Sequence, residues 1–414
     1  MKEKILTKNF GLKNSFKIDV YLEKKGYTAV RKALKEMTPE QILDEVKKAN
    51  LRGRGGAGFP AGVKWSFVPD VDKPKYLCAN ADEGEPGTFK DRYIMAHDPH
   101  LLIEGVIITC FCVGIHHAFI YIRGEYEAVA LRLEQAISEA YEKGFLGKNI
   151  LKTGFKLDIT VHRGAGAYIC GEETGLLESL EGKRGYPRLK PPFPASIGLF
   201  QCPTVINNVE TLSNVPAIIL KGADWFCQQG LPGDGGTRIF GVSGMVKNPG
   251  IYELPVGTSL RDIIFKHAGG MKEGKTLKAV IPGGMSAPIL RADEIDLKMD
   301  FDSLVEAKSM LGSAAIIVID EETPILEVLK AVAKFYSHES CGQCTPCRIG
   351  TSWINKIVKR LVQGKGEQED LKAILRLANN ILGKTLCPLG DAAAMPISSI
   401  VEKFNDELES SLIQ

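Results

Sequence analysis

The sequence predicts a chain of several domains that combines an α/β unit, a small α+β unit and a helical bundle. Three observations lead to this fold class. Apolar segments with strand character run into glycine-rich loops in the first half of the chain. Short strand-like segments follow a glycine-rich linker at 231–236, and four amphipathic helical segments fill residues 324–408. A chain of 414 residues has room for about two to four domains.

Composition and charge exclude several classes of protein. The chain is 44% hydrophobic and 25% charged, which is typical of soluble folded domains. Its net charge of +2, without any run rich in lysine or arginine, gives no support for nucleic-acid binding. The N-terminal segment MKEKILTKNFGLKNS lacks the long apolar stretch of a signal peptide. Ten cysteines in such a chain indicate metal binding or buried thiols rather than disulfides.

The first element to justify is a helix that runs into a glycine-rich loop. The tetrapeptide TPEQ at 38–41 is a capping box with proline at the first helical position, and apolar residues follow at helical spacing. The loop LRGRGGAGFPAGVKW fits G-x-G-x-x-G. A Rossmann fingerprint, however, needs a strand before the glycines and a helix directly after them. Here a helix precedes the loop, and we expect Pro60 to prevent a helix directly after it. Its glycines and cations fit close approach to an anion; a flexible surface turn is the alternative.

The next segments predict a buried α/β core. Residues 75–79 have the pattern of a buried strand, and the loop NADEGEPGTFKDR follows it at 80–92. Four carboxylates in this loop fit a ligand crevice at the carboxyl end of a strand, or else a solvated turn or a calcium loop. The apolar stretch at 105–122 could span a membrane by length, but it carries two histidines and a glycine. We expect it to be the end of a buried helix that begins after residues 98–99, followed by a buried strand.

A second glycine-rich segment has the context that the first one lacks. The strand KLDITVHRG runs into GAGAYICGEETGLLESLEG, so strand, glycines and helix follow in order, and this is the better phosphate cradle. Glu172 and Glu173 lie near the helix start, where the helix dipole alone favours carboxylates. A stiff loop with four cations, GKRGYPRLKPPFPA, comes next. Asn207 and Asn208 then open a helix, one of them as its cap.

After the linker LPGDGG the pattern changes to that of a small α+β domain of β-grasp type. A hairpin-like pair of segments, the capped helix SLRDIIFKHAGG and further short strands reach residue 320. No charged cluster or metal-binding set is evident there, so we interpret it as a spacer or docking module. The expected domains are an N-terminal helical and glycine-loop region at 1–70, a Rossmann-like domain at 71–232, the β-grasp domain at 236–322 and a helical bundle at 323–414.

Four cysteines form the most specific pattern in the chain. Cys341, Cys344 and Cys347 are spaced C-x-x-C-x-x-C, and Cys387 is followed by proline. This pattern is typical of four sulfurs that hold a [4Fe-4S] cluster, whereas a structural zinc site usually has two separate C-x-x-C pairs. The remaining six are expected to be small buried side chains: Cys78, Cys110, Cys112, Cys170, Cys202 and Cys227.

The flanking helices support the same site independently. We expect helices at 324–336, 348–362, 367–382 and 391–408. In an up-down bundle the first and third connections lie at the same end, and these connections contain the cysteine triplet and Cys387. Topology alone therefore brings the four thiols together. His338 is expected at the surface or around the site, because four cysteines already complete it.

These motifs, in this order, resemble one family over nearly the whole chain, residues 10 to 410. RGRGGAGFPAGVKW, NADEGEPGTFKDR, GAGAYICGEETGLLESLEGKRGYPR, PPFPA, INNVET, SCGQCTPCR and CPLGD are similar to the NADH-binding flavoprotein subunit of NADH:quinone oxidoreductase, respiratory complex I. The resemblance implies FMN in a Rossmann-like domain with an unusual nucleotide mode, then a β-grasp domain and a helical bundle with one [4Fe-4S] cluster. It implies that the first glycine loop belongs to a combined FMN/NADH pocket.

The resemblance also implies roles for individual residues. Those implied to bind FMN are Gly53, Arg54, Gly55, Lys64, Asn80, Asp82, Glu83, Tyr168, Gly171, Glu172, Glu173, Asn207, Asn208 and Thr211. Those implied to contact NADH are Phe59, Phe67 and Phe193 by stacking, Glu85 and Glu173 near the nicotinamide, and Lys190 near the dinucleotide. Those implied to bind the cluster are Cys341, Cys344, Cys347 and Cys387. Ala61 and Phe89 depart from the threonine and cysteine that are frequent in the family.

The implied reaction is hydride transfer from NADH to FMN, followed by release of single electrons to the cluster and onward toward quinone. A hydride transfer needs no general acid or base, so none is assigned. The implied partners are a small [2Fe-2S] thioredoxin-like subunit and a large iron–sulfur subunit, on the cytoplasmic or matrix face of a membrane that this chain does not enter. A diaphorase subunit of an NAD-linked hydrogenase or formate dehydrogenase is the alternative, and a zinc-stabilised scaffold without catalysis is a third possibility.

Overall fold

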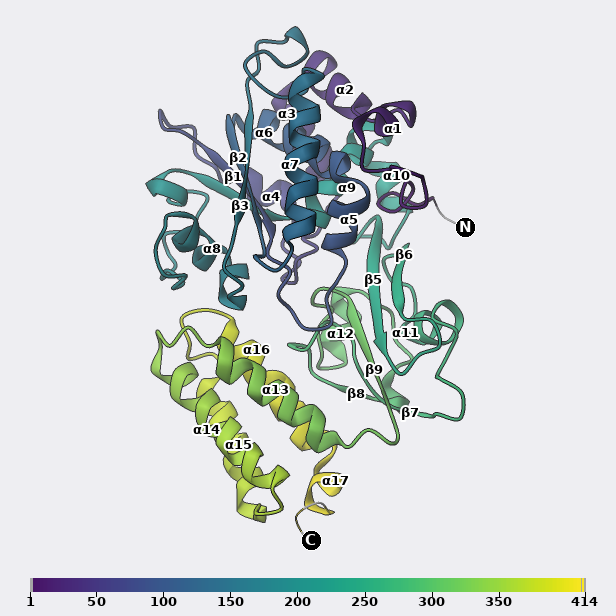
Figure 1. Cartoon of the computed structure of the whole chain (residues 1–414), viewed down its shortest axis with the longest axis vertical. Helices are drawn as coiled ribbons and strands as arrows, with labels where there is room; N and C mark the ends of the chain where they lie inside the picture. Colours follow the sequence, from purple (N-terminus) through teal and green to yellow (C-terminus); the bar gives the residue numbers. More distant parts are fainter. Residues whose placement is uncertain (1–2, 411, 413–414) are drawn as a thin grey trace.

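The computed structural model describes residues 3–410 and 412 and consists of three regions (Figure 1). An α/β region with the N-terminal helices occupies one end of the long axis. A smaller mixed sheet lies beside the middle, and a bundle of helices forms the other end. The mixed α/β architecture confirms the predicted fold class.

The N-terminal region consists of short helices that lead into the first glycine loop. They are α1 (Ile18–Glu23), α2 (Thr28–Glu36), α3 (Pro39–Lys48) and α4 (Ala61–Trp65). The predicted capping box at the start of α3 is present, since Thr38 accepts a hydrogen bond from the Gln41 amide. The expectation that Pro60 prevents a helix directly after the loop was wrong, because α4 begins at the next residue. A helix's first residues need no N–H partner, so a proline just before them does no harm.

A parallel four-stranded sheet in the order β3-β2-β1-β4 organises the α/β region. Its strands are β1 (Tyr76–Ala81), β2 (His117–Ile122), β3 (Asp158–Arg163) and β4 (Thr204–Asn208). The first three match the strands expected from the sequence. The strand β4 was missed, because it has only five residues and its last one, Asn208, also caps the helix that follows.

Helices pack around this sheet. They are α5 (Asp91–His97), α6 (Pro99–Val113), α7 (Glu127–Glu142), α8 (Glu173–Leu180), α9 (Val209–Lys221) and α10 (Ala223–Gln228), with short 3-10 turns at Ile150–Lys152, Tyr168–Gly171 and Leu199–Gln201. The buried helix and strand expected around 105–122 are α6 and β2. Within the described residues no single helix is long and apolar enough to cross a membrane, and α5 and α6, which together have the length, bend by 102°.

The second sheet has the order β6-β5-β9-β7-β8 and lies beside the first region. Its strands are β5 (Thr237–Gly244), β6 (Gly250–Pro255), β7 (Leu277–Ile281), β8 (Leu290–Arg291) and β9 (Ala315–Asp320). Its helical turns are α11 (Leu260–Asp262), Ile263–His267, Ala292–Glu294 and α12 (Phe301–Glu306). The strand β5 pairs parallel with β9, and the other pairs are antiparallel. Arg238 on β5 is fully buried and donates to the backbone carbonyl oxygens of Arg54 over 3.5 Å and Gly312 over 2.6 Å.

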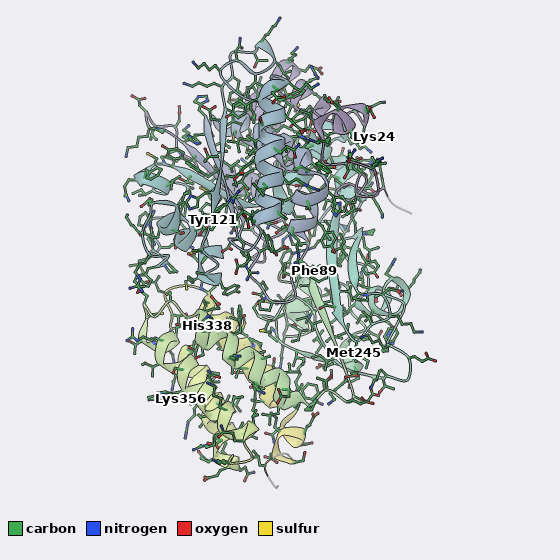
Figure 2. The ribbon with its side chains drawn as sticks, in the orientation of Figure 1. Lys24, Phe89, Tyr121, Met245, His338 and Lys356 are labelled. Atoms are coloured by element: carbon green, nitrogen blue, oxygen red, sulfur yellow. The ribbon has the colours of Figure 1, made fainter. Side chains whose placement is uncertain are left out.

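The C-terminal bundle contains α13 (Ile325–Glu339), α14 (Thr345–Val362), α15 (Gln368–Ile381), α16 (Leu389–Lys403) and the short α17 (Asn405–Ser410). The helix expected at 391–408 is thus two helices. Each long helix packs against its neighbours in sequence, and α16 closes the bundle against α13. The connections at 340–344 and 382–388 therefore lie at the same end, as the sequence predicts. His338, labelled in Figure 2, lies near that end with its side chain 84% exposed.

The six cysteines outside the triplet and Cys387 follow the expectation of burial only in part. Cys78, Cys110 and Cys170 are buried, whereas Cys112, Cys202 and Cys227 are partly exposed. All ten cysteines are free thiols in this structure.

Gly105 offers a sharp test of the packing between α6 and α9. A Cβ added there would lie 2.0 Å from the Leu212 carbonyl oxygen, which belongs to helix backbone and cannot rotate away. We expect Gly105→Ala to destabilise the chain by about 1–3 kcal/mol through overpacking. Thermal unfolding measures this, and Gly11→Ala is the matched control, because nothing lies within 4 Å of its added Cβ. Equal melting temperatures for both variants would contradict the packing described.

Candidate functional site

The first glycine loop is fixed against the carboxyl end of β4. A Cβ added to Gly55 would lie 3.1 Å from the Asn208 Cβ, so a larger residue there would require Asn208 to shift by a few tenths of an ångström. The Arg54 amide donates to the Thr211 hydroxyl over 2.9 Å. These contacts favour a built loop over the alternative of a flexible surface turn.

The Arg54 side chain points away from the crevice and into the protein. It is fully buried, with Nη1 3.2 Å from the Asp234 carboxylate and Nη2 2.8 Å from the Gly235 carbonyl oxygen. Only the backbone of Arg54 is therefore free to take part in the predicted binding of FMN. The Arg54 side chain instead anchors residues 231–236, the segment that was expected to be a linker. A buried arginine paired in this way fixes the α/β region against the second sheet.

The loop at 80–92 follows β1 and is held by its own carboxylate. Glu83 accepts hydrogen bonds from the Lys90 and Asp91 amides, both over 2.7 Å, and so caps the start of α5. Burial raises the Glu83 pKa to about 7, and the nearby Asp91 carboxylate acts in the same direction. This use of Glu83 within the loop argues against a calcium loop and against a solvated turn.

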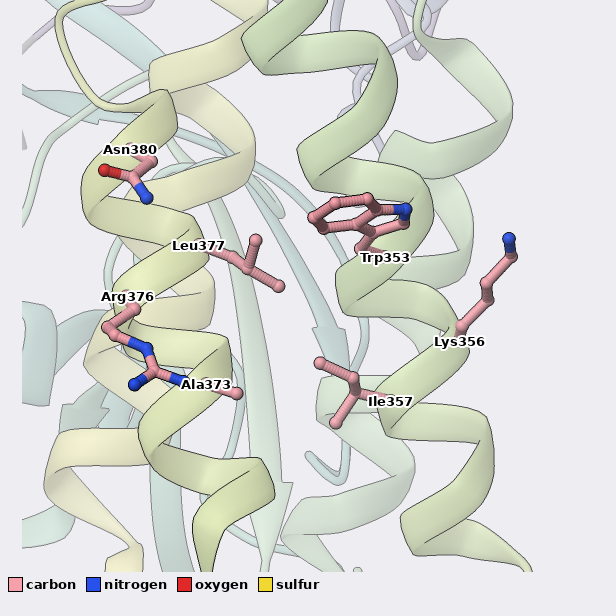
Figure 3. A pocket seen from close by; sticks show the side chains of 7 residues that line it. All are labelled: Trp353, Lys356, Ile357, Ala373, Arg376, Leu377 and Asn380. Carbon is pink, nitrogen blue, oxygen red and sulfur yellow. The ribbon is translucent and has the colours of Figure 1, made fainter.

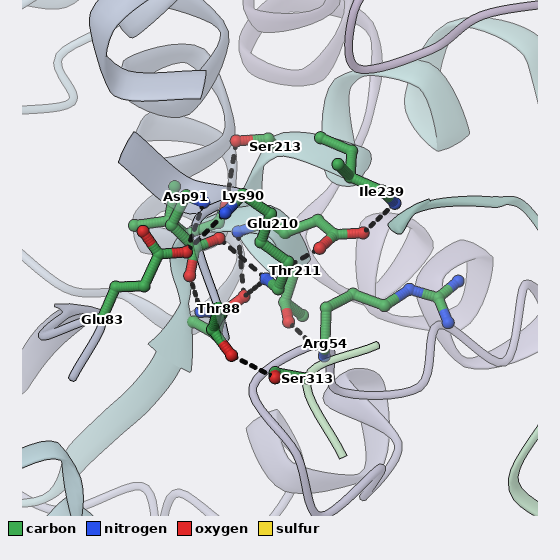
Figure 4. A network of polar contacts seen from close by, with 12 residues as sticks. Arg54, Glu83, Thr88, Lys90, Asp91, Glu210, Thr211, Ser213, Ile239 and Ser313 are labelled. Atoms are coloured by element: carbon green, nitrogen blue, oxygen red, sulfur yellow. Dashed lines mark hydrogen bonds and ion pairs between the residues drawn. The ribbon is translucent and has the colours of Figure 1, made fainter. Parts of the chain in front are cut away.

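A buried ion cluster joins this loop to α9 and β5 (Figure 4). The Lys90 ammonium lies 2.7 Å from a Glu210 oxygen and 2.8 Å from an Asp91 oxygen, and all three side chains are buried. Glu210 also accepts from the Ile239 amide of β5 over 3.1 Å. Burial opposes the charge of Lys90, but the surrounding carboxylates outweigh it and raise the lysine pKa.

Asp82 provides an acceptor that the protein itself leaves unused. Its Oδ2 is buried and has no hydrogen-bond partner, and it lies beside Gly171, where an added Cβ would approach it to 3.7 Å. Burial raises the Asp82 pKa to about 7, although Arg123 acts in the opposite direction. The Asn80 amide donates to the Gly171 carbonyl oxygen over 2.9 Å, which joins the loop at 80–92 to the second glycine segment. A ligand hydroxyl fits such an orphaned acceptor.

The second glycine segment is a weaker phosphate cradle than its sequence context predicts. Glu172 is the N-cap of α8 and accepts from the Thr174 and Gly175 amides over 2.7 and 3.0 Å. These amides, which were expected to face a phosphate, already hold a carboxylate. The alternative interpretation, a carboxylate favoured by the helix start, is the arrangement found for Glu172.

A chain of alternating charges connects the two glycine segments. Lys190 donates to Glu172 over 2.9 Å and to Glu173 over 2.7 Å, and Lys64 lies 3.3 Å from the other Glu173 oxygen. Burial opposes ionisation of Glu173, but the two lysines together hold its pKa below the usual value. Lys64 also donates over 3.1 Å to the Ile206 carbonyl oxygen, two residues before the end of β4. The set therefore lies close to the carboxyl edge of the sheet.

Three aromatic rings on the first glycine loop, after α4 and on the proline-rich loop are exposed. Phe59 and Phe67 flank α4 with ring centroids 6.1 Å apart and exposed fractions of 46% and 57%. Phe193, on the proline-rich loop, is 57% exposed. Large exposed aromatic rings beside a charged crevice are suited to stacking on planar groups of a ligand.

Asn207 is tied down by an aromatic partner instead of by a ligand. Its side-chain oxygen accepts from the Trp65 indole over 2.8 Å, and both side chains are buried. Asn208 caps α9 through the Glu210 amide, as expected for one of the pair, and its amide group donates to Asp91 over 2.7 Å. The contacts of these two asparagines thus fix the carboxyl end of β4 against α4, α5 and α9.

All three regions meet at Glu85 and Tyr168. One Glu85 oxygen accepts from the Ser286 amide of the second sheet over 2.7 Å, and the other accepts from the Tyr168 hydroxyl. The Tyr168 amide donates to Glu339 over 3.0 Å, and its ring meets Phe335 edge-on at 5.1 Å. Glu339 is the last residue of α13, so this joint fastens the bundle to the crevice.

The four cysteines gather at the end of the bundle that faces this joint. Cys344 caps α14, Cys347 lies in its first turn, and Cys387 lies just before the start of α16. Burial raises the pKa of Cys347 to about 11 and of Cys387 to about 12, and nearby cysteines act in the same direction on both.

Within the described residues, no three histidine, cysteine or acidic side chains already surround a metal position. The donor set nevertheless suits a cluster, because it consists of four thiols from two connections at one end of the bundle. The backbone places the two connections that carry these thiols at the same end of the bundle.

Sequence reasoning missed five residues that hold the site together: Lys90, Asp91, Glu210, Ser286 and Glu339. Lys90 and Asp91 lie in the acidic loop motif, Glu210 lies in INNVET, and Glu339 lies just before the cysteine triplet. Their place inside or beside these motifs was a usable signal for four of them. Ser286 carries none, since it acts through its backbone amide.

Three family models match this chain. The Nuo51 FMN-binding domain matches residues 46–217, the SLBB domain 239–290, and the NADH-ubiquinone oxidoreductase-F iron-sulfur binding region 327–411. These matches support the FMN and [4Fe-4S] predictions, and each covers one of the three regions described above.

Curated relatives match over nearly the full length. The F 2 subunit of the NADH-quinone oxidoreductase of Rhizobium meliloti (strain 1021) is 53% identical over 408 residues, which is 98% of this chain and 97% of that protein. The F subunit of the NADH-quinone oxidoreductase of Rickettsia typhi is 51% identical over 392 residues, 94% of this chain and 93% of the relative. Among solved structures, an NAD+-reducing [NiFe]-hydrogenase in the H2-reduced state has a TM-score of 0.85 and 35% identity. That match covers 95% of this chain and 66% of the hydrogenase chain, about two thirds of its length.

The raised pKa of Asp82 makes the stability of the flavin-free chain depend on pH. A carboxyl with a folded pKa near 7 and an unfolded pKa near 3.8 binds more protons when folded, so stability is lost as pH rises from about 4 to 7. We expect Asp82→Asn to reduce the loss of unfolding free energy between pH 5 and pH 8 by about 2 kcal/mol. Denaturant unfolding at both pH values measures this. An identical pH dependence in the variant and the parent chain would contradict the burial described.

The contact between Glu339 and Tyr168 predicts a variant in which electron transfer to the iron–sulfur cluster is slowed and flavin reduction is not. Hydrogen bonds to charged groups contribute about 1.5–3 kcal/mol, so Glu339→Ala should loosen the contact between α13 and Tyr168. In stopped-flow absorption with NADH, flavin reduction should keep its rate and iron–sulfur reduction should slow. Glu327→Ala is the control, because Glu327 lies on the same helix with its side chain 52% exposed. If both variants reduce the iron–sulfur centre at the parent rate, the joint has no role in transfer.

Proposed function

The chain belongs to the family of NADH-quinone oxidoreductase F subunits, and from this we propose how its residues serve electron entry. It is the NADH dehydrogenase flavoprotein subunit of such a complex, with FMN, a [4Fe-4S] cluster and NADH as its cofactors and substrate. The observation that carries this proposal is the joint of Glu85, Tyr168 and Glu339, because it sets the crevice of the sheet directly against the cysteine end of the bundle.

The crevice residues hold the flavin. Gly53 and Gly55 let the loop backbone come close, and Asn80 and Asp82 offer polar atoms to the flavin's hydroxyl chain. Lys64 brings positive charge to the carboxyl edge of the sheet. The other residues implied to bind flavin position these groups or line the crevice between them: Arg54, Glu83, Tyr168, Gly171, Glu172, Glu173, Asn207, Asn208 and Thr211.

The exposed rings and the alternating charges hold NADH. Phe59, Phe67 and Phe193 offer faces for the adenine and nicotinamide rings. Lys190 attracts the dinucleotide phosphates, while Glu173 accepts ribose hydroxyls and limits how tightly the oxidised product is held. Glu85 closes the nicotinamide end of the crevice.

FMN supplies two-electron chemistry with NADH and one-electron chemistry with the cluster, so the protein supplies binding, orientation and electrostatics. Cys341, Cys344, Cys347 and Cys387 hold the cluster through their thiolates. The buried Lys90 and Glu210 keep the loop at 80–92 from shifting during turnover. None of these residues needs to donate or accept a proton in the hydride transfer.

As one subunit of a larger oxidoreductase, the chain works with other subunits of that complex. The partners we propose are a small [2Fe-2S] thioredoxin-like subunit and a large iron–sulfur subunit that carries electrons toward quinone. The proposed location is the peripheral part of the complex, on the cytoplasmic or matrix side of the membrane.

A diaphorase subunit of an NAD-linked hydrogenase is the second candidate, and the hydrogenase structure at 35% identity favours it. The curated F subunits match at 49–53% identity over 92–98% of the chain. The higher identity over the whole length favours the quinone oxidoreductase.

Removal of one cysteine tests the order of the two cofactors. Cys387→Ser should lower bound iron and abolish the paramagnetic signal of the reduced cluster, while NADH still bleaches the flavin. Cys202→Ser is the control, because Cys202 lies outside the bundle and partly exposed. Unchanged iron content and signal in Cys387→Ser would remove this cysteine from the proposed ligands.

The Glu173 carboxylate has a separate test. Glu173→Gln removes the charge that faces Lys64 and Lys190, so we expect nucleotide affinity to change by about tenfold, the effect of roughly 1.4 kcal/mol. Flavin content should change less than the nucleotide affinity does. Equilibrium titration with NADH and NAD+ measures the affinities, and unchanged binding of both nucleotides would exclude the proposed role.

A further inference from the structure

A groove on the outer face of the bundle belongs to none of the sites described. It lies between α14 and α15 and has a volume of about 470 Å³ (Figure 3). Apolar side chains and two cations make up most of its lining: Trp353, Ile357, Ala373, Leu377, Lys356 and Arg376. The bundle core lies on the other side of these helices, where Ile354 and Ile374 are buried.

Trp353 is unusual for a surface residue. Its exposed fraction is 53%, although it lies in the middle of a long, well-packed helix. In Figure 3 its ring lies along the groove, opposite Leu377 across the gap. Exposed tryptophans that line a groove are the kind of side chain that anchors protein partners.

The charge of α14, α15 and their connections is mainly positive. Residues 345–387 contain eight lysines and arginines and three acidic residues, in a chain with 52 basic and 50 acidic residues. The three acidic residues, Glu367, Glu369 and Asp370, all lie at the start of α15, away from the cysteine end. Within the described residues, Lys356 and Lys359 have no carboxylate at ion-pair distance, and Arg376 has only Glu369 at 3.5 Å. A partner that fits this face is acidic.

The groove is also close to the cysteines. Trp353 lies six residues after Cys347 on the same helix, about 9 Å along its axis at about 1.5 Å per residue. On α15 the groove reaches Asn380, seven residues before Cys387. The helix α13 joins the α/β region through Glu339, whereas α14 and α15 lie on the side of the bundle away from the second sheet (Figure 1).

We propose that this groove docks an acidic amphipathic segment of the iron–sulfur subunit that accepts electrons from this chain. This inference rests on the proposed function, because only a chain that passes electrons on requires an acceptor beside its cluster. The apolar floor takes up the apolar side of the segment, while Lys356 and Arg376 pair with its carboxylates. Together they hold the acceptor within a short distance of the cysteine end.

The test uses the full chain with its cofactors and the separately purified iron–sulfur subunits of the same complex. Two variants disrupt the groove: Trp353→Ala and the double reversal Lys356→Glu with Arg376→Glu. Two controls change matched groups elsewhere: Leu131→Ala, at 54% exposure, and Lys330→Glu on α13. Binding is measured by biolayer interferometry at low and high salt.

We expect each groove variant to weaken binding at least tenfold, and the charge reversal also to remove its salt dependence. The controls should bind like the parent chain. Reduction of the flavin and the cluster by NADH should be the same in all variants as in the parent chain. If NADH does not reduce the parent chain, that result contradicts the proposed function and not the docking proposal. Parent-like affinity of both groove variants overturns the docking proposal.

Hydrogen exchange on the parent complex provides a second measurement that needs no variant. Docking predicts protection of residues 353–357 and 373–380 when the iron–sulfur subunits are added. Protection elsewhere only, or a self-associated chain whose dimer is lost in Trp353→Ala, overturns the proposal in favour of another occupant.

Discussion

The buried pairing of Lys90 with Glu210 and Asp91 is the interaction on which the rest of the site depends. Charges this deep in the protein are costly unless each is paired, so the loop that carries Lys90 has one acceptable position against α9. Glu210 also holds the Ile239 amide, and therefore the same cluster fixes the second sheet. A loop positioned from both sides can present Asn80, Asp82 and Glu85 without rearrangement.

From that loop the constraint extends to the bundle. Glu85 connects it to Ser286 and to Tyr168, and Tyr168 connects it to the end of α13. The triplet Cys341, Cys344 and Cys347 follows within eight residues of Glu339. Three hydrogen bonds, from Ser286 to Glu85, from Tyr168 to Glu85 and from Tyr168 to Glu339, thus connect the three regions. They hold the carboxyl edge of the sheet against the cysteine end of the bundle.

Much of this could be predicted from the sequence, because its signals are local. Helix caps, apolar strands and cysteine spacing depend on neighbouring residues, so α3, β1 and the four-helix bundle were predictable. The strand β4 was missed because five residues give too short a pattern. The partners of Arg54 and Glu85 lie about 180 and 200 residues away, and no spacing in one sequence reveals such pairs. At Glu172 the sequence correctly predicted the start of a helix but not its role. We expected the amides there to bind a phosphate, whereas the Glu172 carboxylate itself accepts their hydrogen bonds.

The most direct test of the central claim, that NADH electrons enter at the crevice and reach the cysteine end within this chain, is an anaerobic absorption titration of the purified protein with NADH. Released cofactor is identified by chromatography, and iron and sulfide are assayed. Flavin and iron–sulfur bands that both bleach, with FMN in the extract, are the predicted result. A colourless zinc protein after full reconstitution, or a bound flavin that NADH does not reduce, would contradict it.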